Sequence, residues 1–235
     1  MQCLRMVKVG SVTCDDPRVD AAAVEELKRE AARTAAELVE DGMRVGLGTG
    51  STVRHLLPAL AARGLRGLRC VATSEATEIQ ARELGLAVEP FAELDALDLA
   101  IDGADQVAPD GWLVKGGGGA HVREKIVAAA AARFVVIVDE RKLVDAVAPP
   151  VPLELLRYGL AATLRALAPA TVRDAPPSPD GNVIADFQGE AGDPAALAAR
   201  LSATPGVVGH GLFEPALVHD VIVAAAGGVR RVAVR

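Results

Sequence analysis

Short apolar runs alternate with longer amphipathic segments along the first two thirds of the chain. An Ala-rich segment from Asp20 to Val39 has its apolar residues at helical spacing and leads to Asp41-Gly42, so it predicts an amphipathic helix that ends at a glycine. The sequence RVGLG (44–48) then predicts a short buried strand, and TVRHLLPALAARG (52–64) predicts the helix that follows it. The repeating unit is therefore a strand, a loop and a helix.

The same alternation recurs further along the chain. Apolar strands are predicted at 68–73, 96–102 and 134–139, and helical segments at 74–85, 121–134 and 140–146. Apolar strands that are each followed by a helix are typical of a mostly parallel sheet with both faces covered. We therefore expect an α/β fold with a Rossmann-like sheet.

The pattern changes at Ala148, where a proline-rich linker begins. Beyond it we expect a helix at 156–167, a strand at 183–188 and another helix from Asp193. The segment 220–234 is a strand, a glycine turn and a strand that we expect to return to the large sheet. The expected domains are an N-terminal extension (1–20), a large α/β catalytic domain (21–147 and 218–235) and a small α+β, ferredoxin-like domain (148–217).

Composition and charge narrow the function classes. A chain of 235 residues that is 51% hydrophobic can bury a substantial core. Its net charge of −6 argues against a general nucleic-acid or membrane-surface binder, because those surfaces carry the same sign. Cys3, Cys14 and Cys70 have neither a zinc-site spacing nor a disulfide framework, which favours a reducing cytoplasm. No stretch is a clear membrane span, and residues 1–20 are not a convincing signal peptide.

The glycine-rich loop from Gly46 to Thr52 is a candidate anion site. Its glycines allow backbone N–H groups to approach a ligand, with a helix N-terminus behind them and hydroxyl groups beside them. The loop lacks the third glycine of the dinucleotide fingerprint and the Gly-Lys-Ser/Thr of a nucleotide P-loop. On this stretch alone, a tight turn with a helix cap at Ser51 or Thr52 is an equally good interpretation.

Two carboxylates follow the apolar run of the third predicted strand. Asp102 and Asp105 fall at its carboxyl end, which is where ligands bind in an open parallel sheet. They are either acid–base groups or turn formers, because Asp-Gly is a common turn.

The sequence KGGGGAHVREK (115–125) is harder to explain as a turn. Four consecutive glycines, Gly116 to Gly119, carry a large conformational-entropy cost, so close approach of the backbone to a ligand is the better explanation. Lys115 enters this loop, and Glu124 lies in the first turns of the helix that leaves it. The helix terminus and a neighbouring cation would keep Glu124 ionised at neutral pH, as a base requires, although a surface glutamate is the alternative. We expect His121 to be solvated or to cap the helix.

Together these motifs resemble the type A family of ribose-5-phosphate isomerases. The resemblance rests on five segments in family order and spacing, and it covers the chain from about residue 22 to the end. The segments are GLGTGST (46–52), TSEATEIQARELGL (73–86), DLAIDGADQV (98–107), KGGGGAHVREKIV (115–127) and FVVIVDERKLV (134–144).

The resemblance implies interconversion of D-ribose 5-phosphate and D-ribulose 5-phosphate through an enediolate, with no cofactor and no metal. It implies that Glu124 moves a proton between C2 and C1, and that Lys115 and the glycine amides stabilise the enediolate oxygen. Asp102 and Asp105 would handle hydroxyl protons and ring opening. The implied substrate-binding residues are Thr49, Gly50, Ser51, Thr52, Asp102, Gly103, Ala104, Asp105, Lys115, Gly116, Gly117, Gly118, Lys142 near the phosphate and, as a weaker candidate, Lys28. A homodimer or homotetramer is also expected.

Two positions depart from the family pattern. Gln106 stands where an acidic residue is usual, which we expect to tune the site without abolishing activity, and His121 stands where the family tends to have an aliphatic residue. Two other function classes stay open: a non-catalytic sugar-phosphate sensor, and a coenzyme A transferase or deaminating isomerase on a similar scaffold. A sensor needs no base, so the presence of Glu124 favours an enzyme. No helix-turn-helix with a basic face is apparent.

Overall fold

The computed structural model describes residues 21–94 and 96–235, so the expected N-terminal extension, with Cys3 and Cys14, lies outside the described residues. The larger of its sheets has six strands in the order β13-β12-β6-β3-β1-β2, and all neighbours are parallel except β12 and β13. Its strands are β1 (Arg44–Leu47), β2 (Arg69–Ala72), β3 (Leu99–Asp102), β6 (Phe134–Asp139), β12 (Asp220–Ala225) and β13 (Gly228–Ala233). The predicted α/β class with a mostly parallel sheet is confirmed, and so is the return of the C-terminal hairpin to this sheet.

Alternation within the strands explains why both faces of this sheet are covered. In β6, Val135 and Ile137 pack on one face, whereas Val136 and Val138 pack on the other. The first face contacts α1 (Ala21–Ala36), α2 (Val53–Ala62) and α3 (Glu75–Glu83). The second contacts α4 (His121–Ala130) and the 3-10 turn η1 (Phe91–Glu93).

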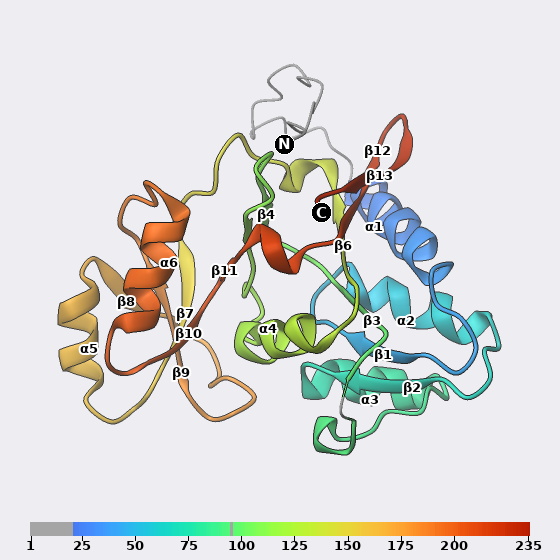
Figure 1. Ribbon diagram of the computed structural model, residues 1–235, viewed down its shortest axis with the longest axis horizontal. Helices are drawn as coiled ribbons and strands as arrows, with labels where there is room; N and C mark the ends of the chain where they lie inside the picture. The colour runs from blue at the N-terminus through green and yellow to red at the C-terminus, as the bar shows by residue number, and fades with distance from the viewer. Residues whose placement is uncertain (1–20, 95) are drawn as a thin grey trace.

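A separate antiparallel sheet has the order β10-β7-β9-β8 and packs against α5 and α6 (Figure 1). Its elements are β7 (Val151–Leu155), α5 (Leu160–Leu167), β8 (Ala170–Val172), β9 (Val183–Phe187), α6 (Pro194–Ala203) and β10 (Val207–His210). The helix expected at 156–167 begins only at Leu160, because Gly159 takes a left-handed conformation with φ of 72°. The domain boundaries given above stay a prediction.

A third, small sheet lies between the other two, as Figure 1 shows. It consists of β4 (Gln106–Val107), β5 (Leu113–Val114) and β11 (Leu212–Phe213), followed by the 3-10 turn η3 (Pro215–Leu217). The helix expected at 140–146 is wrong: only the 3-10 turn η2 (Glu140–Lys142) forms there. The chain then becomes extended at Leu143, and the N–H of Val144 donates to the carbonyl of Val107, so this segment joins β4 instead of continuing a helix.

Candidate active site

The first glycine loop follows β1 and packs directly on Asp102. A Cβ at Gly48 would lie 1.9 Å from Asp102 Oδ1, so a side chain there would displace the carboxylate. Asp102 Oδ1 accepts hydrogen bonds from the N–H groups of Thr49 (3.1 Å) and Gly103 (2.7 Å). Gly48 is therefore needed for the aspartate at the end of β3 to meet the loop after β1.

Hydroxyl groups after β2 support the same loop. Thr49 Oγ1 and Thr73 Oγ1 are 2.8 Å apart, and Thr77 Oγ1 donates to the carbonyl of Gly48 at 2.9 Å. Thr52 precedes α2 but makes no side-chain capping hydrogen bond, so capping does not explain this hydroxyl. The sequence analysis missed Thr73 and Thr77. Their position just after a parallel strand was the available signal.

Lys115 lies between two buried carboxylates. Its Nζ is 2.8 Å from Asp102 Oδ2 and 3.1 Å from Glu124 Oε2, and all three side chains are at most 4% exposed. The ammonium also donates to the carbonyl of Gly103. Its contacts with the two carboxylates are close ion pairs. Among the described residues, neither Asp102 Oδ2 nor Glu124 Oε2 receives another hydrogen bond.

Burial controls the protonation of this cluster. Burial and the charge of Asp102 raise the pKa of Glu124 from 4.5 to about 8, although Lys115 opposes the change. Burial also raises the pKa of Asp102. Burial alone would lower the pKa of Lys115, but Asp102 and Glu124 together raise it. Burial and the charge of Asp102 therefore oppose the ionisation of Glu124 that a neighbouring cation was expected to favour.

Asp105 holds the second glycine loop from one side. The N–H of Gly117 donates to Asp105 Oδ2 at 2.8 Å. Gly116 and Gly119 have φ angles of 105° and 75°, and the N–H of Gly119 donates to the carbonyl of Gly116 in a tight turn. The run of glycines thus serves both a left-handed backbone and close contact with Asp105.

His121 is neither solvated nor a cap, contrary to expectation. It is the first residue of α4 and is fully buried, and the backbone of Gly209 lies near its ring, but neither ring nitrogen forms a hydrogen bond of good geometry with it. A Cβ at Gly116 would lie 2.7 Å from His121 Nδ1, so the ring packs under the glycine loop. Burial, with a further contribution from Lys125, lowers the pKa of His121 to about 3 and keeps the ring neutral.

The two candidate phosphate lysines lie on different elements. Lys142 lies in η2, just beyond the carboxyl end of β6, and forms no ion pair with a described residue. Lys28 of α1 contacts Glu25, whose other oxygen lies 2.9 Å from His55 Nε2 in the first turn of α2. Lys28 therefore stands near the start of the helix that follows the first glycine loop.

Gln106 forms two hydrogen bonds with the backbone of Ala148, and an ionised acidic residue at position 106 could form only one of them. Its side-chain amide donates to the carbonyl of Ala148 at 2.9 Å, and its side-chain oxygen accepts from the N–H of Ala148 at 2.8 Å. This pair joins β4 to the linker before β7. Among the described residues, Gln106 forms no hydrogen bond with Lys115 or Glu124.

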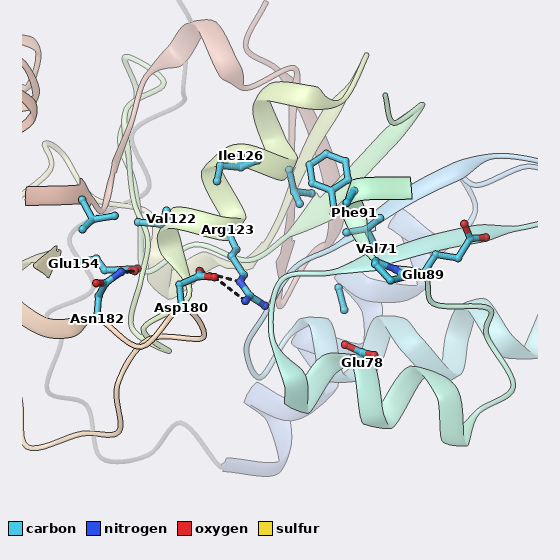
Figure 2. A pocket seen from close by; sticks show the side chains of 15 residues that line it. Val71, Glu78, Glu89, Phe91, Val122, Arg123, Ile126, Glu154, Asp180 and Asn182 are labelled. Atoms are coloured by element: carbon cyan, nitrogen blue, oxygen red, sulfur yellow. Dashed lines mark hydrogen bonds and ion pairs between the residues drawn. The ribbon is translucent and has the colours of Figure 1, made fainter. Parts of the chain in front are cut away.

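A groove of about 580 Å³ is lined by Val122, Arg123, Ile126 and Val127 of α4 and by residues of other elements. Figure 2 shows Arg123 extending into it and pairing with Asp180, with Glu154 and Asn182 at one end and Phe91 at the other. None of the catalytic candidates lines this groove.

The arrangement of these residues is suited to proton transfer on a small anionic substrate. Glycine loops, buried carboxylates and a buried lysine meet at the carboxyl edge of a parallel sheet. Within residues 21–94 and 96–235, no group of three or more His, Cys, Asp or Glu side chains is arranged to hold a metal. Over the same residues, no helix is long and apolar enough to cross a membrane.

Comparison with known proteins identifies the family. The family model for ribose 5-phosphate isomerase A (phosphoriboisomerase A) matches residues 69–228. Ribose-5-phosphate isomerase A of Nitrobacter hamburgensis is 45% identical over 226 residues, which cover 88% of this chain and 97% of that protein. The chain belongs to the ribose 5-phosphate isomerase A family and is an aldose–ketose isomerase of pentose phosphate metabolism.

Solved structures agree with this assignment. The crystal structure of ribose 5-phosphate isomerase A from Neisseria gonorrhoeae has a TM-score of 0.86 at 31% identity and covers 90% of this chain and 98% of that one. A D-ribose-5-phosphate isomerase in complex with phospho-erythronic acid has a TM-score of 0.84 at 36% identity, with 89% and 99% of the two chains covered. The resemblance seen in the sequence is confirmed, and the sensor and transferase alternatives are not supported.

Proposed function

We propose that the Lys115–Asp102–Glu124 cluster interconverts D-ribose 5-phosphate and D-ribulose 5-phosphate. The observation that supports this most strongly is the buried ammonium placed between two carboxylate oxygens that receive no other hydrogen bond from the described residues. A carboxylate with a free lone pair and a raised pKa is suited to accept a proton from carbon near neutral pH.

In the forward direction, Glu124 removes the proton from C2 of the open-chain aldose. The electrons of that C–H bond form the C1–C2 double bond, and the carbonyl oxygen at C1 becomes the enediolate oxygen. Lys115 and backbone N–H groups of the Gly116–Gly118 segment stabilise this charge. Glu124 then returns the proton to C1, while the hydroxyl proton at O2 is lost and O1 gains one, so atoms and charge balance.

Asp102 is suited to the hydroxyl proton transfer because its Oδ2 lies against Lys115 and its Oδ1 is fixed by two backbone N–H groups. Asp105 holds Gly117 through Oδ2, which leaves Oδ1 for a sugar hydroxyl or for ring opening. We assign the remaining contacts to the sugar and phosphate to residues Thr49, Gly50, Ser51, Thr52, Gly103, Ala104, Lys142 and Lys28.

The phospho-erythronic acid bound to the related isomerase supports this assignment of substrate class. It is a phosphorylated sugar acid, and its planar, anionic carboxylate resembles the enediolate group formed at C1 and C2. Incubating the purified protein with ribose 5-phosphate and following ketose formation tests the proposal. Absence of ketose under conditions in which the protein is folded would overturn it.

We also propose a cytoplasmic homodimer or homotetramer. Ile126 lines the groove of Figure 2 and is 52% exposed, and Ile79 of α3 is 51% exposed; exposed apolar side chains of this size are consistent with a covered face in an assembly. Light scattering on the purified protein measures the mass directly, and a mass near that of one chain would contradict this part of the proposal.

A further inference from the structure

Arg173 connects the antiparallel sheet to the second glycine loop. It follows β8, and its Nη1 donates to the carbonyls of Gly116 (2.9 Å) and Gly117 (3.2 Å). Its Nε and Nη2 donate to the two oxygens of Asp186 in β9, each at 2.6 Å. The guanidinium is therefore held by a carboxylate on one side and holds two successive peptide carbonyls on the other.

Fixing these carbonyls also fixes the N–H groups of the same peptides. In a trans peptide the C=O and N–H bonds point in opposite directions. The peptide whose carbonyl belongs to Gly116 therefore directs the N–H of Gly117 away from Arg173, where it meets Asp105 Oδ2 at 2.8 Å. By the same geometry, the N–H of Gly118 is directed away from Arg173. It finds no hydrogen-bond acceptor in residues 21–94 and 96–235.

An N–H group that is oriented but has no acceptor is what a site for a developing oxyanion requires. We propose that Arg173 is a positioning residue that aims the Gly117 and Gly118 amides at Asp105 and at the enediolate. The proposal rests on the function assigned above to the Gly116–Gly118 segment. Arg173 does not touch the substrate in this arrangement, and Asp186 neutralises its charge, so its contribution is geometric.

Without Arg173 the flexible glycine peptides are free to rotate, because glycine populates both signs of φ. Lysine would keep the positive charge but could not form the two-pronged contact with Asp186 while also contacting both carbonyls. Arg173→Ala and Arg173→Lys should therefore both lower kcat, by about 10²-fold for alanine, with KM changed much less. Guanidinium ion added at subdenaturing concentration should partly restore kcat in Arg173→Ala but not in wild type.

The matched control is Arg123→Ala. Arg123 also pairs with an aspartate beyond β8, Asp180, but it lies in the groove of Figure 2 and touches neither glycine loop. It should leave kcat within about threefold of wild type. Thermal unfolding of all variants is measured on the same preparations, and Arg173→Lys, which retains the charge, decides the matter if the alanine variant does not fold.

Binding of phospho-erythronic acid separates positioning from general loosening. Its affinity should fall in Arg173→Lys, whereas the affinity for inorganic phosphate should stay near wild type. Wild-type kcat in both Arg173 variants would overturn the proposal, and so would an equal loss in Arg123→Ala. If Glu124→Gln is inactive while Arg173→Lys is fully active, only the positioning proposal fails; if Glu124→Gln is also active, the proposed function of the site fails with it.

Discussion

Lys115 Nζ and Glu124 Oε2 lie 3.1 Å apart, and both side chains are almost completely buried. In a medium of low dielectric, such a pair is stabilised by attraction but loses the solvation of both charges. Because Asp102 shares the same ammonium, the cluster has two carboxylates for one cation. That excess of negative charge adds to burial in raising the pKa of Glu124 to about 8.

The first prediction concerns the pH dependence of catalysis. The base must be ionised to accept the carbon proton, and its pKa is raised from 4.5 to about 8. We therefore expect kcat/KM to rise with pH across that interval and to level off above it. Initial rates at saturating and limiting substrate give the profile. A kcat/KM that is already constant from the ordinary glutamate pKa upward would contradict the raised value.

A second prediction separates the phosphate contacts from the chemistry. Lys142→Ala removes a cation beyond the end of β6 without touching the proton-transfer group, so it should mainly raise KM. Lys28→Ala should do the same, with a smaller effect. The control is Arg230→Ala, which removes an exposed cation from the edge strand β13 and should change neither constant. An unchanged KM with a collapsed kcat in Lys142→Ala would mean that this lysine has a different function.

Chelation provides a third test. Lys115 and backbone N–H groups supply the positive charge that stabilises the enediolate in our mechanism, so no divalent ion is required. Activity should survive dialysis against a strong chelator, measured as kcat before and after treatment. Loss of turnover that Mg²⁺ or Mn²⁺ restores would exclude the mechanism as written.

The fourth prediction concerns the stability contributed by His121. The buried ring nitrogens of His121 have the Gly209 backbone nearby but form no hydrogen bond of good geometry with it, and a buried polar group in that state costs about 1–3 kcal/mol. His121→Leu, which also resembles the family pattern, should therefore raise the free energy of unfolding at neutral pH by about 1 kcal/mol or more. Urea unfolding at constant pH measures the change, and a loss of stability would show that the ring has a partner.

We also expect the stability of His121→Leu to depend less on acidic pH than that of wild type. The pKa of His121 is lowered from 6.5 to about 3 in the folded protein, so the unfolded chain binds the extra proton first. Wild-type stability therefore falls as pH drops from 6.5 toward 3, and His121→Leu should lose less over that range. His210 is the control. Its pKa is also lowered to about 3, but its ring contacts Ser202 and Leu212, so His210→Leu should be destabilised at neutral pH.

Local sequence patterns were sufficient to predict the large, mostly parallel sheet, but they could not predict how the carboxylate cluster assembles. Apolar strands and amphipathic helices carry their signal within a few residues, so a mostly parallel sheet and the position of Asp102 at a strand end could be predicted. The strands β4, β5 and β11 have only two residues each, too few to show any periodicity, and the small sheet was missed.

The electrostatics of Glu124 could not be predicted from its neighbours in the sequence. Arg123 and Lys125 suggested a solvated helix face, but Arg123 extends to Asp180 and Lys125 donates to the carbonyl of Leu212. The cation that contacts Glu124 is Lys115, which enters from the other side of the glycine loop. Burial and long-range pairing, which depend on the assembled fold, therefore decide the protonation of the base.

The most direct test of the account is Glu124→Gln, which preserves size and polarity and removes the only group assigned to carbon deprotonation. General-base catalysis contributes about 10²–10⁴-fold, so kcat should fall at least that far. Phospho-erythronic acid should still bind, and the unfolding temperature at neutral pH should not fall, because the raised pKa makes ionised Glu124 unfavourable in the folded state. Turnover, ligand binding and unfolding are measured on one preparation. A kcat near wild type, or a joint collapse of turnover and unfolding temperature, would contradict the assignment of Glu124 as the catalytic base.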